Sequence, residues 1–160
     1  MTEMKETSLT YCEWDEALSR VAGIWLKLPV TREQLCIRKL VNATVLRNKA
    51  GEHTSHETDG AGESMIYVKP WTPASLPVYG EAVREALYEY SDIAEYGEVE
   101  YYRYRGERFE RFLQQGMGEP YETVTILVDH YRNVQQTDYE IVYTILDTDR
   151  NKLLLFMTEA

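Results

Sequence analysis

The stretch from Glu81 to Arg105 shows two hydrophobic periods in succession. Its apolar residues first recur three or four positions apart, the spacing of one helix face, at Val83, Ala86, Leu87, Tyr90 and Ala94. Gly97 follows, and glycine commonly ends a helix in the left-handed conformation. From Val99 onward, apolar and charged residues alternate, which is the period of a half-buried strand. The stretch therefore predicts a central helix, a glycine stop and a strand.

Two earlier helices are predicted in the first third of the chain. Apolar residues repeat at helical spacing over residues 13–26, at Trp14, Leu18, Val21 and Trp25. Thr31 followed three residues later by Gln34 is the pattern of a capping box. A second helix is therefore predicted to begin at Arg32 and to end before Gly51.

Strands and loops are predicted for the remainder. Residues 51–64 contain three glycines and no large apolar residue, which predicts a loop. Residues 107–115 fit either a short helix or a strand, and we favour a helix that stops at Gly116. Segments rich in β-branched and aromatic residues predict strands at 65–69, 122–132, 139–147 and 152–158. The last three of these, joined by short turns, predict an antiparallel meander.

These elements predict a single α+β domain over residues 1–160. We expect a curved antiparallel sheet of about 4–6 strands, with an N-terminal helix pair and a central helix packed on one face. Such a sheet, wrapped round a helix, can leave a cone-shaped pocket. The element order is broadly similar to that of nuclear-transport-factor-2-like enzymes and ligand binders, and this similarity implies a pocket of that kind.

Composition and charge limit the classes of partner. The chain is 44% hydrophobic and has a formal net charge of −10, so its surface as a whole repels nucleic acid and anionic membranes. It contains no apolar run long enough for a membrane helix, and its first residues lack the pattern of a secretory signal. We therefore expect a cytoplasmic protein with reduced Cys12 and Cys36, and no membrane or nucleic-acid partner.

An acidic, tyrosine-rich face is the main functional feature of the sequence. The chain has 13 tyrosines against 3 phenylalanines, and tyrosine suits interfaces because it combines apolar area with a hydroxyl. Like charges four residues apart on the central helix cost stability, so their presence suggests a function. We expect a non-catalytic protein that docks a basic protein surface, as an inhibitor, an immunity-type protein or a nucleic-acid mimic does. The predicted docking residues are Glu85, Tyr88, Glu89, Asp92, Glu95, Tyr96, Tyr102 and Tyr104.

The alternative is a small ligand-binding protein or enzyme whose pocket is lined by tyrosine and tryptophan. Its predicted lining is Trp71, Tyr79, His130 and Tyr143, with His130 as the titrating group. The chain lacks a Gly-rich phosphate loop, a Cys-x-x-Cys pair and a Gly-x-Ser-x-Gly elbow. We therefore assign no catalytic residue and expect no cofactor.

Three other patterns give weaker indications of a metal site, of DNA binding and of dimerisation. His53 and His56 have a spacing that could hold zinc or manganese, but a glycine-rich loop is a poor cage, so we expect no metal.

The basic segment 27–50 lies in a predicted helix pair, as in helix-turn-helix DNA readers, yet such residues usually pair with a protein's own acids. The last strand is apolar on both faces, which places it inside the sheet or against a second subunit. Together with the opposite charges of the basic and acidic helices, this suggests a homodimer.

Overall fold

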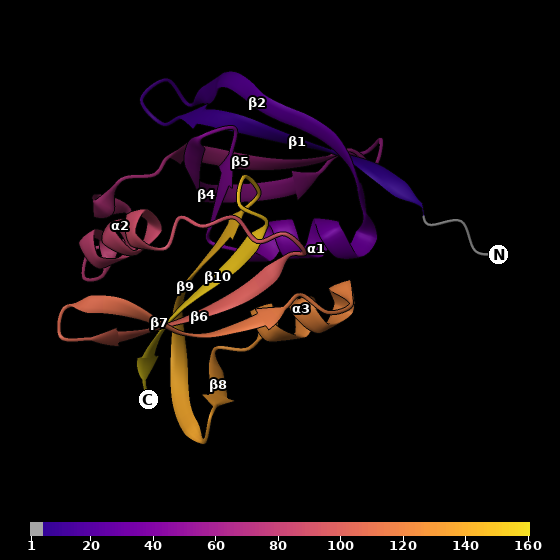
Figure 1. The fold of residues 1–160 in the computed structure, drawn as a ribbon. Helices are drawn as coiled ribbons and strands as arrows, with labels where there is room; N and C mark the ends of the chain where they lie inside the picture. The colour runs from indigo at the N-terminus through magenta and orange to yellow at the C-terminus, as the bar shows by residue number, and fades with distance from the viewer. Residues whose placement is uncertain (1–4) are drawn as a thin grey trace.

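Strands dominate the chain. The computed structural model describes residues 5–160, which contain ten strands in one mixed sheet, three short α-helices and one 3-10 turn (Figure 1). The first half comprises β1 (Glu6–Asp15), β2 (Arg20–Thr31), α1 (Arg32–Leu40), β3 (Ala43–Leu46), β4 (Lys49–Thr58) and β5 (Ser64–Pro70). A connecting segment contains η1 (Pro73–Ser75) and α2 (Gly80–Glu89). The second half comprises β6 (Glu98–Arg105), β7 (Arg108–Gly116), α3 (Pro120–Val128), β8 (Tyr131–Val134), β9 (Thr137–Asp147) and β10 (Lys152–Glu159).

The two halves have the same topology. In each, a hairpin is followed by a helix and three more strands, and the last strand pairs in parallel with the first, β5 with β1 and β10 with β6. The middle strand of the final three, β4 or β9, pairs antiparallel with both of its sequence neighbours. Each half also has a two-residue turn with positive φ at both positions, Arg47–Asn48 and Gln135–Gln136. The protein is therefore a structural duplication of one ββαβββ unit.

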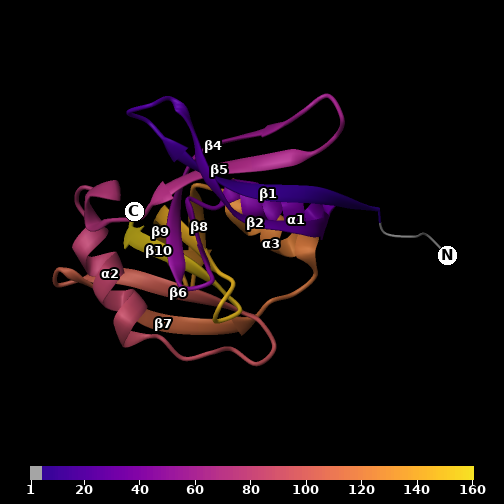
Figure 2. The same cartoon turned by 90° about the horizontal axis from the view of Figure 1, so that it is seen from above.

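The sheet runs continuously from one half into the other. Its strand order is β2-β1-β5-β4-β3-β9-β10-β6-β7, with β8 paired to β9 outside this path. The halves join where Ala43–Val45 of β3 pair in parallel with Ile145–Asp147 of β9, a junction that we call the seam. Figures 1 and 2 show α2 on one side of the seam and α1 with α3 on the other.

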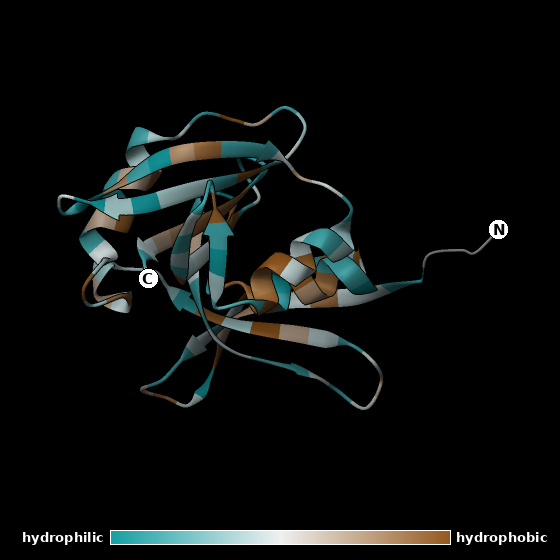
Figure 3. Cartoon of the chain, turned by 90° about the horizontal axis from the view of Figure 1, so that it is seen from below, coloured by the Kyte–Doolittle hydropathy of each residue, from teal (hydrophilic) through white to brown (hydrophobic). Residues whose placement is uncertain are grey.

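The last strand, β10, is covered on both faces. It lies between β9 and β6, so the prediction that it is interior to the sheet is confirmed. Alternate side chains of Leu153–Met157 belong to two hydrophobic clusters, one that includes residues of α2 and one that includes Ile126 of α3. Figure 3 shows hydrophobic and hydrophilic segments alternating along the strands. Because one chain covers both faces of β10, these faces no longer argue for a second subunit.

A buried ion cluster joins β6, β7 and β10, and the loop that follows α2 contacts it. Glu100 is fully buried, and its carboxylate accepts hydrogen bonds from Tyr102 at 2.6 Å and from Arg111 at 3.0 Å. Lys152, 1% exposed, lies 3.3 Å from Glu100 and donates to Asp92 at 3.1 Å. Burial raises the pKa of Glu100, while the hydrogen bond from Tyr102 and the two cations oppose that rise. Removing one partner of a buried ion pair costs about 3–5 kcal/mol, so the Glu100–Lys152 pair stabilises the packing of β6 against β10. Asp92, whose side chain is 53% exposed, joins the loop to this cluster.

The predicted fold class is wrong, because the sheet is mixed and has ten strands. The N-terminal helix pair is wrong as well, since residues 13–26 lie in the β1–β2 hairpin. The register of this hairpin shifts after Tyr11 and again after Glu13, and each bulge interrupts the alternation of side chains. These interruptions left apolar residues at helix-like intervals. Both the helix-turn-helix hypothesis and the likeness to nuclear-transport-factor-2-like proteins depend on an element order that the chain does not have.

The second predicted helix is confirmed at its start and wrong at its end. Thr31 Oγ1 accepts from the Gln34 backbone N–H at 3.2 Å, and Gln34 Oε1 accepts from the Thr31 N–H at 3.0 Å, so the capping box begins α1. After only nine residues α1 gives way to β3 and β4. Gly51 lies inside β4 under the Trp25 ring, where an added Cβ would come within 2.7 Å of that ring. The glycine therefore marks a close approach within the sheet.

Several other segments differ from expectation. The predicted loop 51–64 is mostly strand, because β4 extends to Thr58, and residues 107–115 form β7, the strand alternative. The strand predicted over 122–132 is instead α3 followed by β8, since packing against α1 overrides the low helix propensity of β-branched residues. Gly97 has a φ of +73° but lies in a loop beyond the end of α2. The central helix is confirmed as α2 but ends at Glu89, so Tyr90 and Ala94 lie beyond it. The strands at 65–69, 99–102, 139–147 and 152–158 are confirmed.

Candidate functional site

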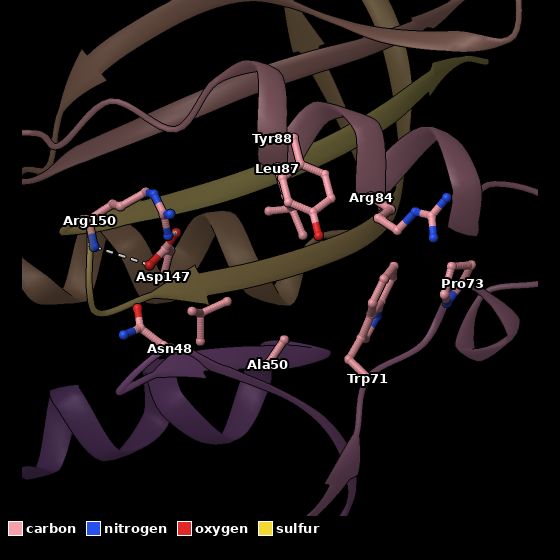
Figure 4. Close-up of a pocket in the computed structure, with 10 residues that line it drawn as sticks. Asn48, Ala50, Trp71, Pro73, Arg84, Leu87, Tyr88, Asp147 and Arg150 are labelled. Carbon is pink, nitrogen blue, oxygen red and sulfur yellow. Dashed lines mark hydrogen bonds and ion pairs between the residues drawn. The ribbon is translucent and has the colours of Figure 1, made fainter.

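A cavity of about 300 Å³ lies at the seam, next to α2 (Figure 4). Its walls come from both halves of the duplication and from the segment that connects them. Small-molecule sites often occur at interfaces between structural units. We call this cavity the seam slot, and its lining is Val45, Asn48, Ala50, Trp71, Pro73, Arg84, Leu87, Tyr88, Asp147 and Arg150.

Hydrogen bonds fix the Trp71 wall of the slot. The Trp71 backbone N–H donates to the Ala50 carbonyl oxygen at 2.9 Å, and its Nε1 donates to the Tyr143 hydroxyl oxygen at 3.0 Å. Tyr143 is 6% exposed, and burial raises its pKa to about 12, so this hydroxyl stays protonated at neutral pH. The indole ring is thus held in one orientation at the edge of the slot.

One end of the slot, at Arg150, is assembled across the seam. Arg150 donates through Nη1 to Asp147 Oδ2 at 3.2 Å and through Nε to the Ser91 carbonyl oxygen at 3.0 Å. The neighbouring Asp149 accepts from both backbone N–H groups of the β3–β4 turn, at 2.9 and 2.8 Å. The guanidinium is therefore positioned before any ligand arrives, which lowers the entropic cost of binding.

The other end of the slot holds Arg84 on α2. Arg84 lies 2.8 Å from Glu81 in an ion pair whose side chains are 50% and 67% exposed. Exposed ion pairs contribute only about 0–1 kcal/mol, so an anionic ligand can compete with Glu81. Arg84 and Arg150 are positive and Asp147 is negative, so the lining has a charge of +1 in a chain whose net charge is −10.

The middle of the slot is apolar. Figure 4 shows Leu87 and Tyr88 on one side and Ala50 on the other, between the two guanidinium groups at opposite ends. Tyr88 is 78% exposed and therefore lies at the rim. Chemically, the slot suits a flat apolar body with an anionic group at one end, because guanidinium groups recognise carboxylate and phosphate oxygens.

The structure brings together three of the four residues of the predicted pocket. Trp71 and Tyr143 share a hydrogen bond, and Trp71 lines the slot. Tyr79 belongs to the hydrophobic cluster around them, where its ring packs edge-on against Tyr104 at a centroid distance of 5.0 Å. His130 is exposed in the connection between α3 and β8, away from this cluster.

The predicted docking residues do not form one continuous surface. Glu89, at the end of α2, bonds to Arg108 at 2.6 Å, and Asp92, in the loop that follows, bonds to Arg111 at 2.9 Å. Cations on β7 therefore compensate both acids. Tyr102 is 1% exposed and stacks on the core. Tyr104 is half-buried, and the exposed remainder is Glu85, Tyr88, Glu95 and Tyr96.

The predicted histidine pair lies on β4 rather than in a loop. His53 Nε2 lies 2.7 Å from Thr44 Oγ1, whereas His56 is exposed. Within residues 5–160, no group of three or more His, Cys, Asp or Glu side chains is placed to hold a metal ion. Both cysteines are free; Cys12 is buried in β1, where burial raises its pKa, and Cys36 is exposed on α1.

The sequence pointed to Trp71 and Tyr88 but assigned them to different sites. Arg84 is the only cation on α2, which is otherwise acidic, and no sequence signal marked Arg150 or Asn48. These two residues meet because turns about a hundred positions apart are bonded across the seam.

Two further findings concern membrane-spanning helices in residues 5–160 and similarity to known proteins. None of the helices in these residues combines the length and apolar character needed to cross a membrane. Comparison of the chain with known protein families, with curated proteins and with solved structures found no match.

Proposed function

We propose that this protein binds a small organic acid that has a flat apolar body. The observation that supports the proposal is the seam slot, in which an apolar floor lies between the guanidinium groups of Arg84 and Arg150. Arginine binds carboxylate and phosphate with paired hydrogen bonds, and the Trp71 ring offers a surface for a planar group. A volume of about 300 Å³ suits a small molecule rather than a folded partner.

A binding role fits the slot better than a catalytic one. Asp147 is the only carboxylate among the ten lining residues; its side chain is 3% exposed, and it accepts from the Arg150 backbone N–H at 3.1 Å and from Arg150 Nη1 at 3.2 Å. A general base needs an oxygen or nitrogen that is free to accept a proton within hydrogen-bond reach of its substrate. The lining therefore supports recognition of a ligand better than proton transfer.

Titration with a matched pair of ligands tests the proposal. Indole-3-acetate should bind saturably by calorimetry, and its neutral analogue indole-3-acetamide should bind more weakly. A hydrogen bond to a charged group contributes about 1.5–3 kcal/mol, which corresponds to roughly tenfold to a hundredfold in Kd. Equal affinity for the acid and the amide, or binding of neither this acid nor other aromatic carboxylates and phosphates, would contradict the proposal.

Three variants locate the binding. Arg84→Gln should weaken acid binding about tenfold, because it removes the guanidinium group for which the ligand competes with Glu81. Ala50→Met should reduce binding of acid and amide alike by filling the apolar floor. Arg32→Gln removes an exposed charge from α1, on the opposite side of the seam, and should leave both affinities unchanged. Loss of acid binding in Arg32→Gln would point to the overall charge rather than the slot.

Our second proposal is that this chain docks a basic protein. The docking surface of the chain would be smaller than the one that the sequence predicted. The support for this proposal is the high exposure of two aromatic side chains, Tyr88 at 78% and Tyr96 at 87%, near Glu85 and Glu95. With a partner isolated from the native host, the double variant Glu85→Gln, Glu95→Gln should slow association at low salt. An unchanged association rate would leave these residues as ordinary surface. Tyr88 also lines the slot, so a bound organic acid should alter docking.

A further inference from the structure

A second cleft lies in the first half of the chain, at the end of the β1–β2 hairpin. It has a volume of about 460 Å³ and is lined by Trp14, Glu16, Thr54, Ser55, Glu57 and Tyr67. The lining comes from the end of β1, the turn after it, and the paired strands β4 and β5. None of these residues lines the seam slot.

The aromatic part of this cleft is a built arrangement. The Trp14 and Tyr67 rings meet edge to face, with centroids 5.7 Å apart and planes at 77°. The Tyr67 hydroxyl donates to Glu57 Oε1 at 2.5 Å. That hydrogen bond is the main cause that raises the Tyr67 pKa to about 12, so the hydroxyl remains a donor at neutral pH. Both rings are only half-buried, which leaves aromatic surface exposed in the cleft.

The cleft carries negative charge and no positive charge of its own. Glu16 and Glu57 are both exposed, and no lysine, arginine or histidine is among the six lining residues. Within residues 5–160 neither carboxylate takes part in an ion pair, whereas Glu63, nearby on the same hairpin, lies 4.0 Å from Lys27. Aromatic faces and carboxylates both attract cations, and their combination favours an organic cation over a metal ion, since aromatic rings are poor metal ligands.

We propose that the cleft between Trp14, Tyr67 and Glu57 binds a methylated or alkyl ammonium group. The rings contact the apolar methyl or methylene groups and attract the charge through their faces, while Glu57 and Glu16 neutralise it. Such a group can come from a free small molecule or from a modified lysine side chain of a peptide. This site is independent of the seam slot, which prefers the opposite charge.

A matched pair of probes tests the charge preference. In NMR titrations, choline should shift the amide signals of Trp14, Ser55 and Tyr67 saturably. The neutral isostere 3,3-dimethylbutan-1-ol has the same shape without the charge, and it should bind at least about fivefold more weakly. A heptapeptide with a central trimethyllysine, titrated in parallel, identifies the source: tighter binding of the peptide indicates a protein side chain, and tighter binding of choline indicates a free metabolite. Absence of saturable shifts with both cations, or equal binding of choline and the alcohol, would overturn the proposal.

Variants in the hairpin separate recognition from folding. Glu57→Gln keeps an acceptor for the Tyr67 hydroxyl but removes the charge, and it should weaken choline binding at least about fivefold. Tyr67→Phe retains the ring and should retain most of the binding. Glu63→Gln removes a charge outside the cleft and should bind choline like the native chain. Equal weakening by Glu57→Gln and Glu63→Gln would show attraction by net charge alone and would overturn the site.

Discussion

His53 shows how one position in the sheet sets the charge of a side chain. Its Nε2 lies 2.7 Å from Thr44 Oγ1, and its ring packs near Tyr11 at a centroid distance of 6.3 Å. Burial lowers the pKa of His53 to about 4 from an ordinary 6.5, and the charge of His56 adds to the effect. The unfolded chain therefore takes up a proton at a higher pH than the folded chain does.

The consequence is a loss of stability in mild acid. Well above pH 6.5 His53 is neutral in both states. Between pH 6.5 and about 4 it is mainly protonated in the unfolded chain and mainly neutral in the folded chain, so the free energy of unfolding falls as the pH falls. The loss should approach roughly 2–3 kcal/mol. Urea unfolding between pH 7 and 4.5 should show a shallower pH dependence in His53→Gln than in the native chain.

His130→Gln is the control for this prediction. It removes an exposed histidine in the connection between α3 and β8, so it should leave the slope of stability against pH unchanged. If His53→Gln and the native chain lost stability in parallel as the pH falls, His53 would not be the group responsible.

The sequence could not reveal which charged residues form ion pairs or are buried. Asp92 was predicted to lie on an uncompensated acidic face, but its partners Arg111 and Lys152 are on distant strands. Glu100 is one of the charged residues in the alternating strand pattern that follows Gly97. That pattern predicts an exposed side chain, whereas Glu100 is fully buried. The pocket hypothesis grouped Trp71, Tyr143 and His130 on residue type alone; Trp71 and Tyr143 share a hydrogen bond, whereas His130 lies away from them.

Elements were predictable where local signals agreed with tertiary packing. The capping box at Thr31 and Gln34 begins a helix because both of its hydrogen bonds are local. β9 and β10 were predicted from their many apolar, β-branched and aromatic residues, and the prediction holds because both strands are central in the sheet, where such residues are buried. The prediction failed in the β1–β2 hairpin, where bulges interrupt the alternation, and in α3, where packing outweighs propensity.

The contribution of the α1 capping box to stability can be measured. Thr31→Ala removes the acceptor for the Gln34 N–H at a position that is 8% exposed, and it should lower the free energy of unfolding by about 1 kcal/mol. Thr125→Ala, at an exposed position within α3, is the matched control and should be neutral or slightly stabilising, since alanine favours helix. Urea unfolding measures both. A similar change in the two variants would show that the cap contributes nothing specific.

The duplication is the property of the whole molecule that the sequence conceals most completely. The two repeats have equally long helices and equal two-residue turns, yet REQLCIRKL in α1 and PYETVTILV in α3 share no pattern. Topology depends on strand pairing over long distances, and those pairs leave no local periodicity. The seam slot exists only because the two repeats are joined side by side, so it could not be predicted before the seam was known.

The turn that follows β9 should control how tightly the two repeats are joined. Asp149 accepts hydrogen bonds from the Arg47 and Asn48 N–H groups across the seam, at 2.9 and 2.8 Å. Asp149→Ala should lower the free energy of unfolding by about 1 kcal/mol, because water replaces part of these exposed bonds. It should also speed hydrogen exchange at the amides of the β3–β4 turn and of Ala43–Val45, ahead of amides elsewhere in the sheet.

Asp59→Ala separates a loosened seam from a general loss of stability. Asp59 Oδ1 accepts from the Ala61 and Glu63 N–H groups at 2.9 and 3.0 Å, which is the same kind of bond confined to one repeat. Its loss should speed exchange only in the β4–β5 loop and leave β3 protected. If both variants raised exchange evenly along the chain, the repeats would unfold as one cooperative unit, and the Asp149 contact would have no special role in joining them.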